Sequence, residues 1–253
     1  MDFTLDAYAQ LVQALKRNGY HFRTFESFVE QPPHTQTVVL RHDVDRLPAN
    51  ALRMAELEHR HGVVASYYFR VVPHVWDEGL MRQVAELGHE VAYHYEDLTL
   101  TRGDHQKAIR HFEEQLGRFR KIYPSKTICM HGSPMSRWDN RQIWDHYNYR
   151  DYGIIAEPYF DVDYQQVFYL TDTGRSWNNA RISVRDKVDS GFDIPVKSTF
   201  HFSELLAGGN VPGQLLINTH PHRWFQPGLG WYKELVSQNV KNVVKSVLVK
   251  AKA

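Results

Sequence analysis

The sequence contains one cysteine, Cys129, and therefore cannot form an intramolecular disulfide. Its net charge is also close to zero. The 30 Lys and Arg nearly balance 29 Asp and Glu to give +1, so no global field attracts nucleic acid or an anionic membrane. No uncharged apolar run approaches the roughly 20 residues of a membrane-spanning helix, and no basic start with an apolar core marks a signal peptide. We expect a cytoplasmic protein with no nucleic-acid partner and no stable membrane insertion.

Several signatures of catalysis and cofactor binding are missing as well. The chain has no Gly-x-Ser-x-Gly elbow, no Walker loop and no Gly-x-Gly-x-x-Gly after a strand. Cys129 lies within an apolar stretch, which favours a buried and inert thiol. These absences argue against a serine hydrolase of the elbow type, a recognisable nucleotide cradle and a zinc finger.

What is present is the pattern of an α/β protein, in a chain with 42% apolar and 23% charged residues. Apolar, β-branched stretches alternate with helical patterns, which is typical of parallel βαβ units. We expect an irregular (β/α) barrel with about seven parallel strands, the alternative being an open doubly wound sheet. The candidate strands are 37–40, 63–69, 90–93, 127–130, 153–156, 167–170 and 214–218. The candidate helices among them are 47–61, 77–87, 102–122 and 140–147.

We expect one domain, because no repeat of fixed period, low-complexity tract or flexible linker divides the 253 residues. Residues 1–35 form an N-terminal helix and lead-in, since apolar residues recur at helical spacing between Tyr8 and Leu15. Residues 36–225 form the barrel, and residues 231–249 form a C-terminal helix.

Histidine and aspartate gather where four candidate strands end. Because the carboxyl ends of parallel strands meet at one edge, these side chains are expected to share a rim where α/β folds place their sites. The four strand ends read Arg41-His42-Asp43-Val44-Asp45, Tyr93-His94-Tyr95-Glu96-Asp97, His131-Gly132-Ser133-Pro134 and Thr219-His220-Pro221-His222.

The residues at these strand ends suit a divalent metal site. Asp43 and Asp45 are two apart, so in extended chain their carboxylates face one side, and a cation resolves the repulsion between them. A helix N-cap alone would require only one of the two. His94 follows a strand and is a candidate ligand, although a lone histidine there is more often a buried, hydrogen-bonded one. His131 has the same context and is a candidate ligand or substrate contact.

His220 and His222 follow the last candidate strand. Histidine titrates near neutrality, so either could protonate a leaving amine or alkoxide. The alternative is a structural pair that shapes the turn around Pro221.

Three of these segments resemble motifs of the NodB-type polysaccharide deacetylases, carbohydrate esterase family four. Gly88-His89-Glu90-Val91-Ala92-Tyr93-His94 resembles their Gly-His-Glu-x-x-x-His segment, Arg41 to Asp45 their first motif in its Asp-x-Asp form, and Asn218-Thr219-His220 their last. The resemblance covers roughly residues 38–224 and is nearest to a WbmS-like bacterial subgroup found beside surface-polysaccharide genes.

The resemblance implies a distorted barrel with one divalent ion, zinc by expectation, that polarises an acetyl carbonyl. Asp43 would be the general base, Asp45 and His94 would be metal ligands, and His220 would be the general acid. The family usually carries a second ligand histidine where this chain has Leu98, which cannot bind metal. His131 is our first substitute, followed by Glu96, Asp97 and His222. The family's Arg-Pro motif is also replaced, by the segment that begins at His131.

The expected reaction is removal of an acetyl group from an acetylated (amino) sugar or glycoconjugate, in surface-polysaccharide metabolism. Trp138, Trp177 and Trp224 are candidate stacking partners for the sugar, and His222 and Arg175 are candidate polar contacts. A cytoplasmic location favours a nucleotide-linked or lipid-linked sugar over mature wall polymer. The alternatives are hydrolysis of another C–N bond, such as a formyl amide, and a non-catalytic barrel that binds carbohydrate or a partner.

Overall fold

A computed structural model describes residues 1–31, 34–178 and 185–252, with backbone only for 243–252. Seven strands form one sheet in which all the pairings are parallel. The order is β5 (Ile128–Met130), β4 (Glu90–Tyr95), β3 (Ser66–Phe69), β2 (Thr37–Val44), β7 (Gln214–Thr219) and β6 (Phe168–Thr171), and β1 (His21–Arg23) pairs with the start of β2. Among the described residues β5 and β6 form the two ends of this order and do not pair with each other, so the barrel is not closed there. The expected α/β architecture with about seven parallel strands is confirmed.

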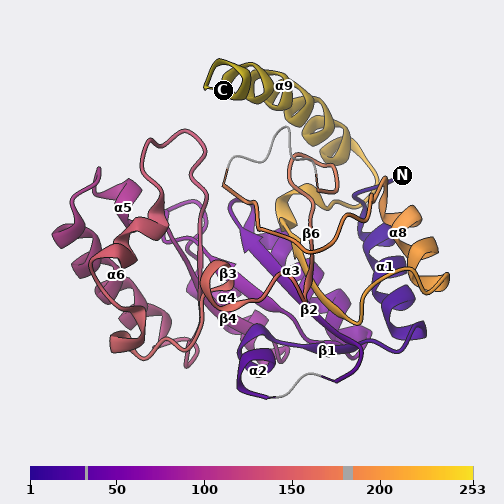
Figure 1. The fold of residues 1–253 in the computed structure, drawn as a ribbon, viewed down its shortest axis with the longest axis horizontal. Coiled ribbons are helices and arrows are strands. Elements are labelled where there is room, and N and C mark those ends of the chain that lie inside the picture. The colour runs from indigo at the N-terminus through magenta and orange to yellow at the C-terminus, as the bar shows by residue number, and fades with distance from the viewer. Residues whose placement is uncertain (32–33, 179–184, 253) are drawn as a thin grey trace.

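Helices surround this sheet (Figure 1). The α-helices are α1 (Leu5–Arg17), α2 (Phe25–Glu30), α3 (Pro48–Arg60), α4 (Glu78–Glu86), α5 (Asp97–Leu100), α6 (His105–Phe119), α7 (Pro158–Asp161), α8 (Thr199–Ala207) and α9 (Leu229–Lys252). Three 3-10 segments are η1 (Asn140–Asp145), η2 (Tyr149–Tyr152) and η3 (Pro221–Arg223). Among the described residues, no helix has both the length and the apolar character needed to cross a membrane.

The central strand β2 positions the chemistry of the fold. All eight of its residues are buried, because neighbouring strands and helices enclose both faces of a parallel sheet. Its register pairs Arg41 with Asn218 of β7 and Asp43 with Tyr68 of β3. The carboxyl ends of β2, β3 and β7 therefore lie at the same edge.

Three segments differ from the sequence-based prediction. Residues 153–156 do not form a strand, because Gly153 takes a left-handed conformation (φ 69°) that caps η2, and Ala156 forms only an isolated bridge to Thr127. The seventh strand is instead β1, which lies within the stretch expected to be the N-terminal lead-in. The segment from Asn140 is also a 3-10 helix rather than an α-helix.

Candidate active site

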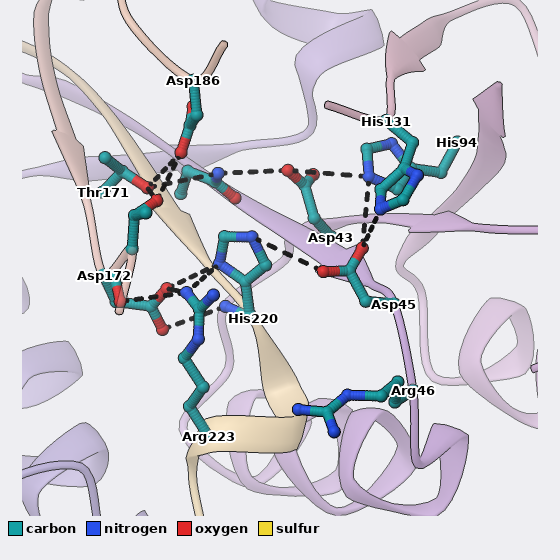
Figure 2. A network of polar contacts seen from close by, with 12 residues as sticks. Asp43, Asp45, Arg46, His94, His131, Thr171, Asp172, Asp186, His220 and Arg223 are labelled. Atoms are coloured by element: carbon teal, nitrogen blue, oxygen red, sulfur yellow. Dashed lines mark hydrogen bonds and ion pairs between the residues drawn. The ribbon is translucent and has the colours of Figure 1, made fainter. Parts of the chain in front are cut away.

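The residues predicted as catalytic or metal-binding converge on one cavity at the carboxyl edge of the sheet. Asp43 belongs to β2 and Asp45 follows it, His94 belongs to β4, and His131 and His220 follow β5 and β7. All five line a cavity of about 90 Å³. Figure 2 shows His220 on one side of Asp45 and the two other imidazoles on the opposite side.

Asp45, His94 and His131 form a group that fits a divalent ion. Asp45 Oδ1 lies 3.5 Å from His94 Nε2 and 3.5 Å from His131 Nε2. One ligand atom from each residue lies within 4.8 Å of the others. A tetrahedral ion bound at 2.0–2.2 Å separates its ligands by about 3.3–3.6 Å. Two imidazoles and one carboxylate are also the donor set of catalytic zinc sites that keep a fourth position open.

Both imidazoles of this group are held in orientation by a contact at Nδ1, the ring nitrogen that faces away from Asp45. His94 Nδ1 lies 2.9 Å from the backbone carbonyl of Cys129, and His131 Nδ1 lies 2.9 Å from Glu96 Oε2. A carbonyl and a carboxylate only accept, so Nδ1 donates in both rings, and in the neutral imidazole Nε2 has the lone pair that a metal ligand needs. Burial alone would raise the pKa of Glu96, but His131 and Arg70 lower it to about 2, so the carboxylate stays ionised.

A second group, Asp43, His94 and Cys129, also has its ligand atoms within 4.8 Å. The thiol is a poor ligand in this position, because burial raises the pKa of Cys129 well above its ordinary value. Only the thiolate binds metal strongly, so the group around Asp45 is the better site.

Asp43 is held at one oxygen. Its Oδ2 accepts hydrogen bonds from Arg41 Nη2 at 2.9 Å and from Asn218 Nδ2 at 3.1 Å. Arg41 is fully buried, and its guanidinium also contacts the hydroxyls of Tyr159 and Tyr169. The carboxylate at the cavity wall is therefore fixed by a charged donor from its own strand and an amide from the next.

His220 is held in the same manner by a buried carboxylate. Its Nδ1 lies 2.6 Å from Asp172 Oδ1, and its Nε2 lies 3.9 Å from Asp45 Oδ2. Burial would raise the pKa of Asp172, but Arg223 and His220 hold it well below the ordinary value. Arg223 Nη1 also lies 2.7 Å from Nδ1 of His220. This guanidinium nitrogen donates to Asp172 Oδ1 and to the backbone carbonyl of Asp172. We therefore assign the Nδ1 hydrogen of His220 to Asp172, which leaves Nε2 facing Asp45.

Leu98 is 1% exposed and packs in the core from α5. Of the four substitutes considered for the missing ligand, only His131 has a ring nitrogen beside Asp45. Glu96 supports His131 from behind, and Asp97 is occupied by His111 and Tyr93.

Three of the predicted substrate contacts do not lie at the cavity. Trp177 and Trp224 are 4% and 0% exposed and pack against Phe3 with ring centroids 5.9 and 5.2 Å apart, so the prediction that they stack on a sugar is wrong. Arg175 lies over Trp231 at 4.8 Å and is absent from the residues that line the cavity in the described chain.

The two other predicted substrate contacts, Trp138 and His222, line depressions next to the cavity. Trp138 is partly buried and lines an open depression together with His131. His222 is buried, and burial together with Arg223 lowers its pKa well below the ordinary value. A neutral imidazole of this kind is a poor general acid, so His222 does not share the role expected of His220.

Sequence reasoning missed Asp172 and Asp186. Asp172 directly follows β6, just as the other site residues follow their strands, so its position at a strand end was the signal that could have found it. Asp186 lines the cavity and accepts hydrogen bonds from the hydroxyls of Thr171 at 2.8 Å and Thr173 at 2.7 Å. It does not follow a strand, so the pattern of polar residues at strand ends carried no signal for it.

No family model and no curated protein sequence matches the chain. Among solved structures, the chain is similar to the Xyl-CE4 domain of a multidomain xylanase from the hindgut metagenome of Trinervitermes trinervoides. The two are 14% identical, the alignment covers 87% of this chain and 84% of that chain, and the TM-score is 0.40. These values are too low to assign the chain to a family.

Proposed function

We propose that this protein is a metal-dependent hydrolase that removes an acetyl group from an acetylated amino sugar. The observation that carries the proposal is the convergence of Asp45, His94 and His131 on one cavity, with Asp43 and His220 in its walls. A role in surface-polysaccharide metabolism, a cytoplasmic location and kinship with the WbmS-like subgroup extend the proposal from the sequence motifs.

Asp45, His94 and His131 would hold the ion, which we propose to be zinc because catalytic zinc sites use this donor set. When bound, a divalent ion supplies Lewis acidity toward an amide or ester carbonyl. The cavity of about 90 Å³ exceeds the roughly 10–15 Å³ of such volume that one water needs, so it can admit the attacking water together with a small acyl group.

Asp43 acts as the general base in this proposal. It takes a proton from the water that attacks the carbonyl carbon, while Arg41 and Asn218 fix the orientation of its carboxylate. Both supporting contacts go to Oδ2, and among the described residues Oδ1 has a polar contact with the Cys129 thiol alone, at 3.9 Å. We therefore assign Oδ1 as the oxygen that receives the proton.

His220 acts as the general acid. It donates a proton from Nε2 to the departing nitrogen as the C–N bond breaks, so that the products are acetate and a free amine. Asp172 keeps the ring in orientation through Nδ1, and Trp224 Nε1 donates to the second oxygen of that carboxylate at 2.8 Å. The buried Trp224 is thus a support for the site and not a contact for the sugar.

Acetate release from N-acetylated sugars by the zinc-loaded protein tests this function, with formate release from the N-formyl analogues measured in parallel. We expect acetate from the wild type and release slower by about 10²–10⁴-fold from Asp43→Asn. Formate alone would move the reaction to another C–N bond, and no product from either series would favour a non-catalytic barrel.

A further inference from the structure

A second and larger cavity of about 500 Å³ opens beside the group of Asp45, His94 and His131. We call it the α9 cleft, because Gln238, Val240 and Lys241 of α9 form one wall. Figure 1 shows α9 lying across the end of the molecule that is opposite β1 and α2. Asp45 and His131 line both cavities, so the α9 cleft adjoins the candidate ion site.

Basic side chains dominate the polar lining of the α9 cleft. Asp45 is the single acid among the lining residues of the described chain, and a divalent ion held there would offset its charge. The four basic residues that line the cleft are Arg46, Arg70, Arg223 and Lys241.

Lys241 is the least compensated of these cations. Among the described residues no carboxylate forms an ion pair with it. Burial and the charges of Arg46 and Arg223 lower the pKa of Lys241, and the charge of Glu234 offsets part of this effect. Arg46 itself has a single contact of 3.3 Å with Glu234, and its side chain is 38% exposed. An anion in the cleft would relieve the repulsion among the three cations.

Two buried polar atoms at the cleft also lack partners. His222 and Arg223 line it and are 3% and 6% exposed, yet His222 Nδ1 and Arg223 Nε have no hydrogen-bond partner among the described residues. A guanidinium Nε can only donate, so it requires an acceptor, whereas Nδ1 of a neutral imidazole is a donor or an acceptor according to its tautomer. The Arg223 donor, together with Lys241, fits a ligand that carries anionic oxygens.

We propose that the α9 cleft binds the phosphate of a phosphorylated sugar while the acetyl group of that sugar lies beside Asp45, His94 and His131. The position of the acetyl group rests on the proposed function. Exposed apolar side chains stand at the rim of the cleft, with Met135 83% and Val240 61% exposed. They offer contact area to whatever the phosphate carries beyond the sugar, whether a nucleoside or a lipid.

Calorimetric titration of the full-length, metal-free protein tests the proposal without any phosphate–metal coordination. The probes are N-acetylglucosamine and N-acetylglucosamine 1-phosphate. We expect the phosphate ester to bind about tenfold tighter or more, equivalent to ~1.4 kcal/mol, and to lose this advantage between about 50 and 500 mM salt. Lys241→Gln should reduce the advantage several-fold, whereas Lys233→Gln, an exposed lysine on the same helix, should leave it unchanged.

Equal binding of the two sugars, or equal effects of Lys241→Gln and Lys233→Gln, would overturn the proposal. Uridine diphosphate N-acetylglucosamine and a farnesyl diphosphate-linked N-acetylglucosamine serve as further probes. Tighter binding of either one than of the neutral sugar supports the proposal and identifies the carrier, and binding of neither contradicts it. Failure of the proposed function would appear separately, as absent zinc retention and absent acetate release, while phosphate binding by the metal-free protein would persist.

Discussion

Glu96→Gln is expected to weaken zinc binding without removing any ligand. Glu96 is 2% exposed and lies between Arg70 and His131. It accepts from Arg70 Nε at 2.7 Å and Nη2 at 2.9 Å, and its Oε2 lies 2.9 Å from His131 Nδ1. The substitution removes the charge that fixes the His131 tautomer and replaces one acceptor oxygen with a donor amide.

The expected loss of zinc affinity is about 10–100-fold, the usual effect of removing a partner behind a metal-bound imidazole. This corresponds to ~1.4–2.8 kcal/mol. Competition against a chromophoric chelator measures the affinity, and thermal unfolding shows whether the variant remains folded.

Asp97→Asn is the matched control for Glu96→Gln. Asp97 is the next residue in the chain and is buried like Glu96, and its substitution removes the same single negative charge. Its carboxylate, however, contacts His111 and Tyr93 and no expected metal ligand. We expect its zinc affinity to equal that of the wild type. If Glu96→Gln binds zinc as the wild type does, or if both variants weaken binding alike, the role assigned to Glu96 is refuted.

Three further predictions follow from the site and its surroundings. Asp43→Asn should retain zinc but lose turnover by about 10²–10⁴-fold, as expected for removal of a general base; elemental analysis and acetate release measure the two, and full activity would refute the assignment. Leu98→Ala should destabilise the fold by about 2–5 kcal/mol because it opens a cavity in the core, with zinc binding unchanged; denaturant unfolding measures the loss, and a loss of zinc would contradict the position of Leu98. Asp172→Asn should cost about 3–5 kcal/mol at pH 7, because it leaves Arg223 without its buried partner. The pKa of Asp172 is lowered in the fold from 3.8, so this stabilisation is complete above that value and is lost as the pH falls below it; unfolding at several pH values should show the difference shrinking below about pH 4, and a constant difference would contradict the account.

The sheet and the convergence of the site could be predicted from the sequence because both depend on local patterns. Buried parallel strands appear as continuous apolar runs, and the residues that follow them must meet at one edge. The strand β1 was missed because three residues are too few to show a pattern, and residues 153–156 were misassigned because an apolar run does not reveal that Gly153 closes a 3-10 turn.

The supporting residues of the site could not be predicted in the same way. An indole in a predicted loop has the same sequence signature whether it is exposed or packed, so Trp177 and Trp224 were mistaken for sugar contacts. Asp172 and Glu96 act through other side chains, and their partners become evident only when the register of the sheet places them together. The α9 cleft likewise depends on where α9 packs, which the helical pattern alone does not determine.

Zinc content measured by elemental analysis after metal loading and desalting tests the central claim most directly, for the wild type beside His94→Ala. The account predicts near-stoichiometric zinc in the wild type and its loss in the variant, with both proteins folded by thermal unfolding. A folded wild type that retains no zinc, or a His94→Ala variant that retains as much as the wild type, would contradict the assignment of Asp45, His94 and His131 as the metal site.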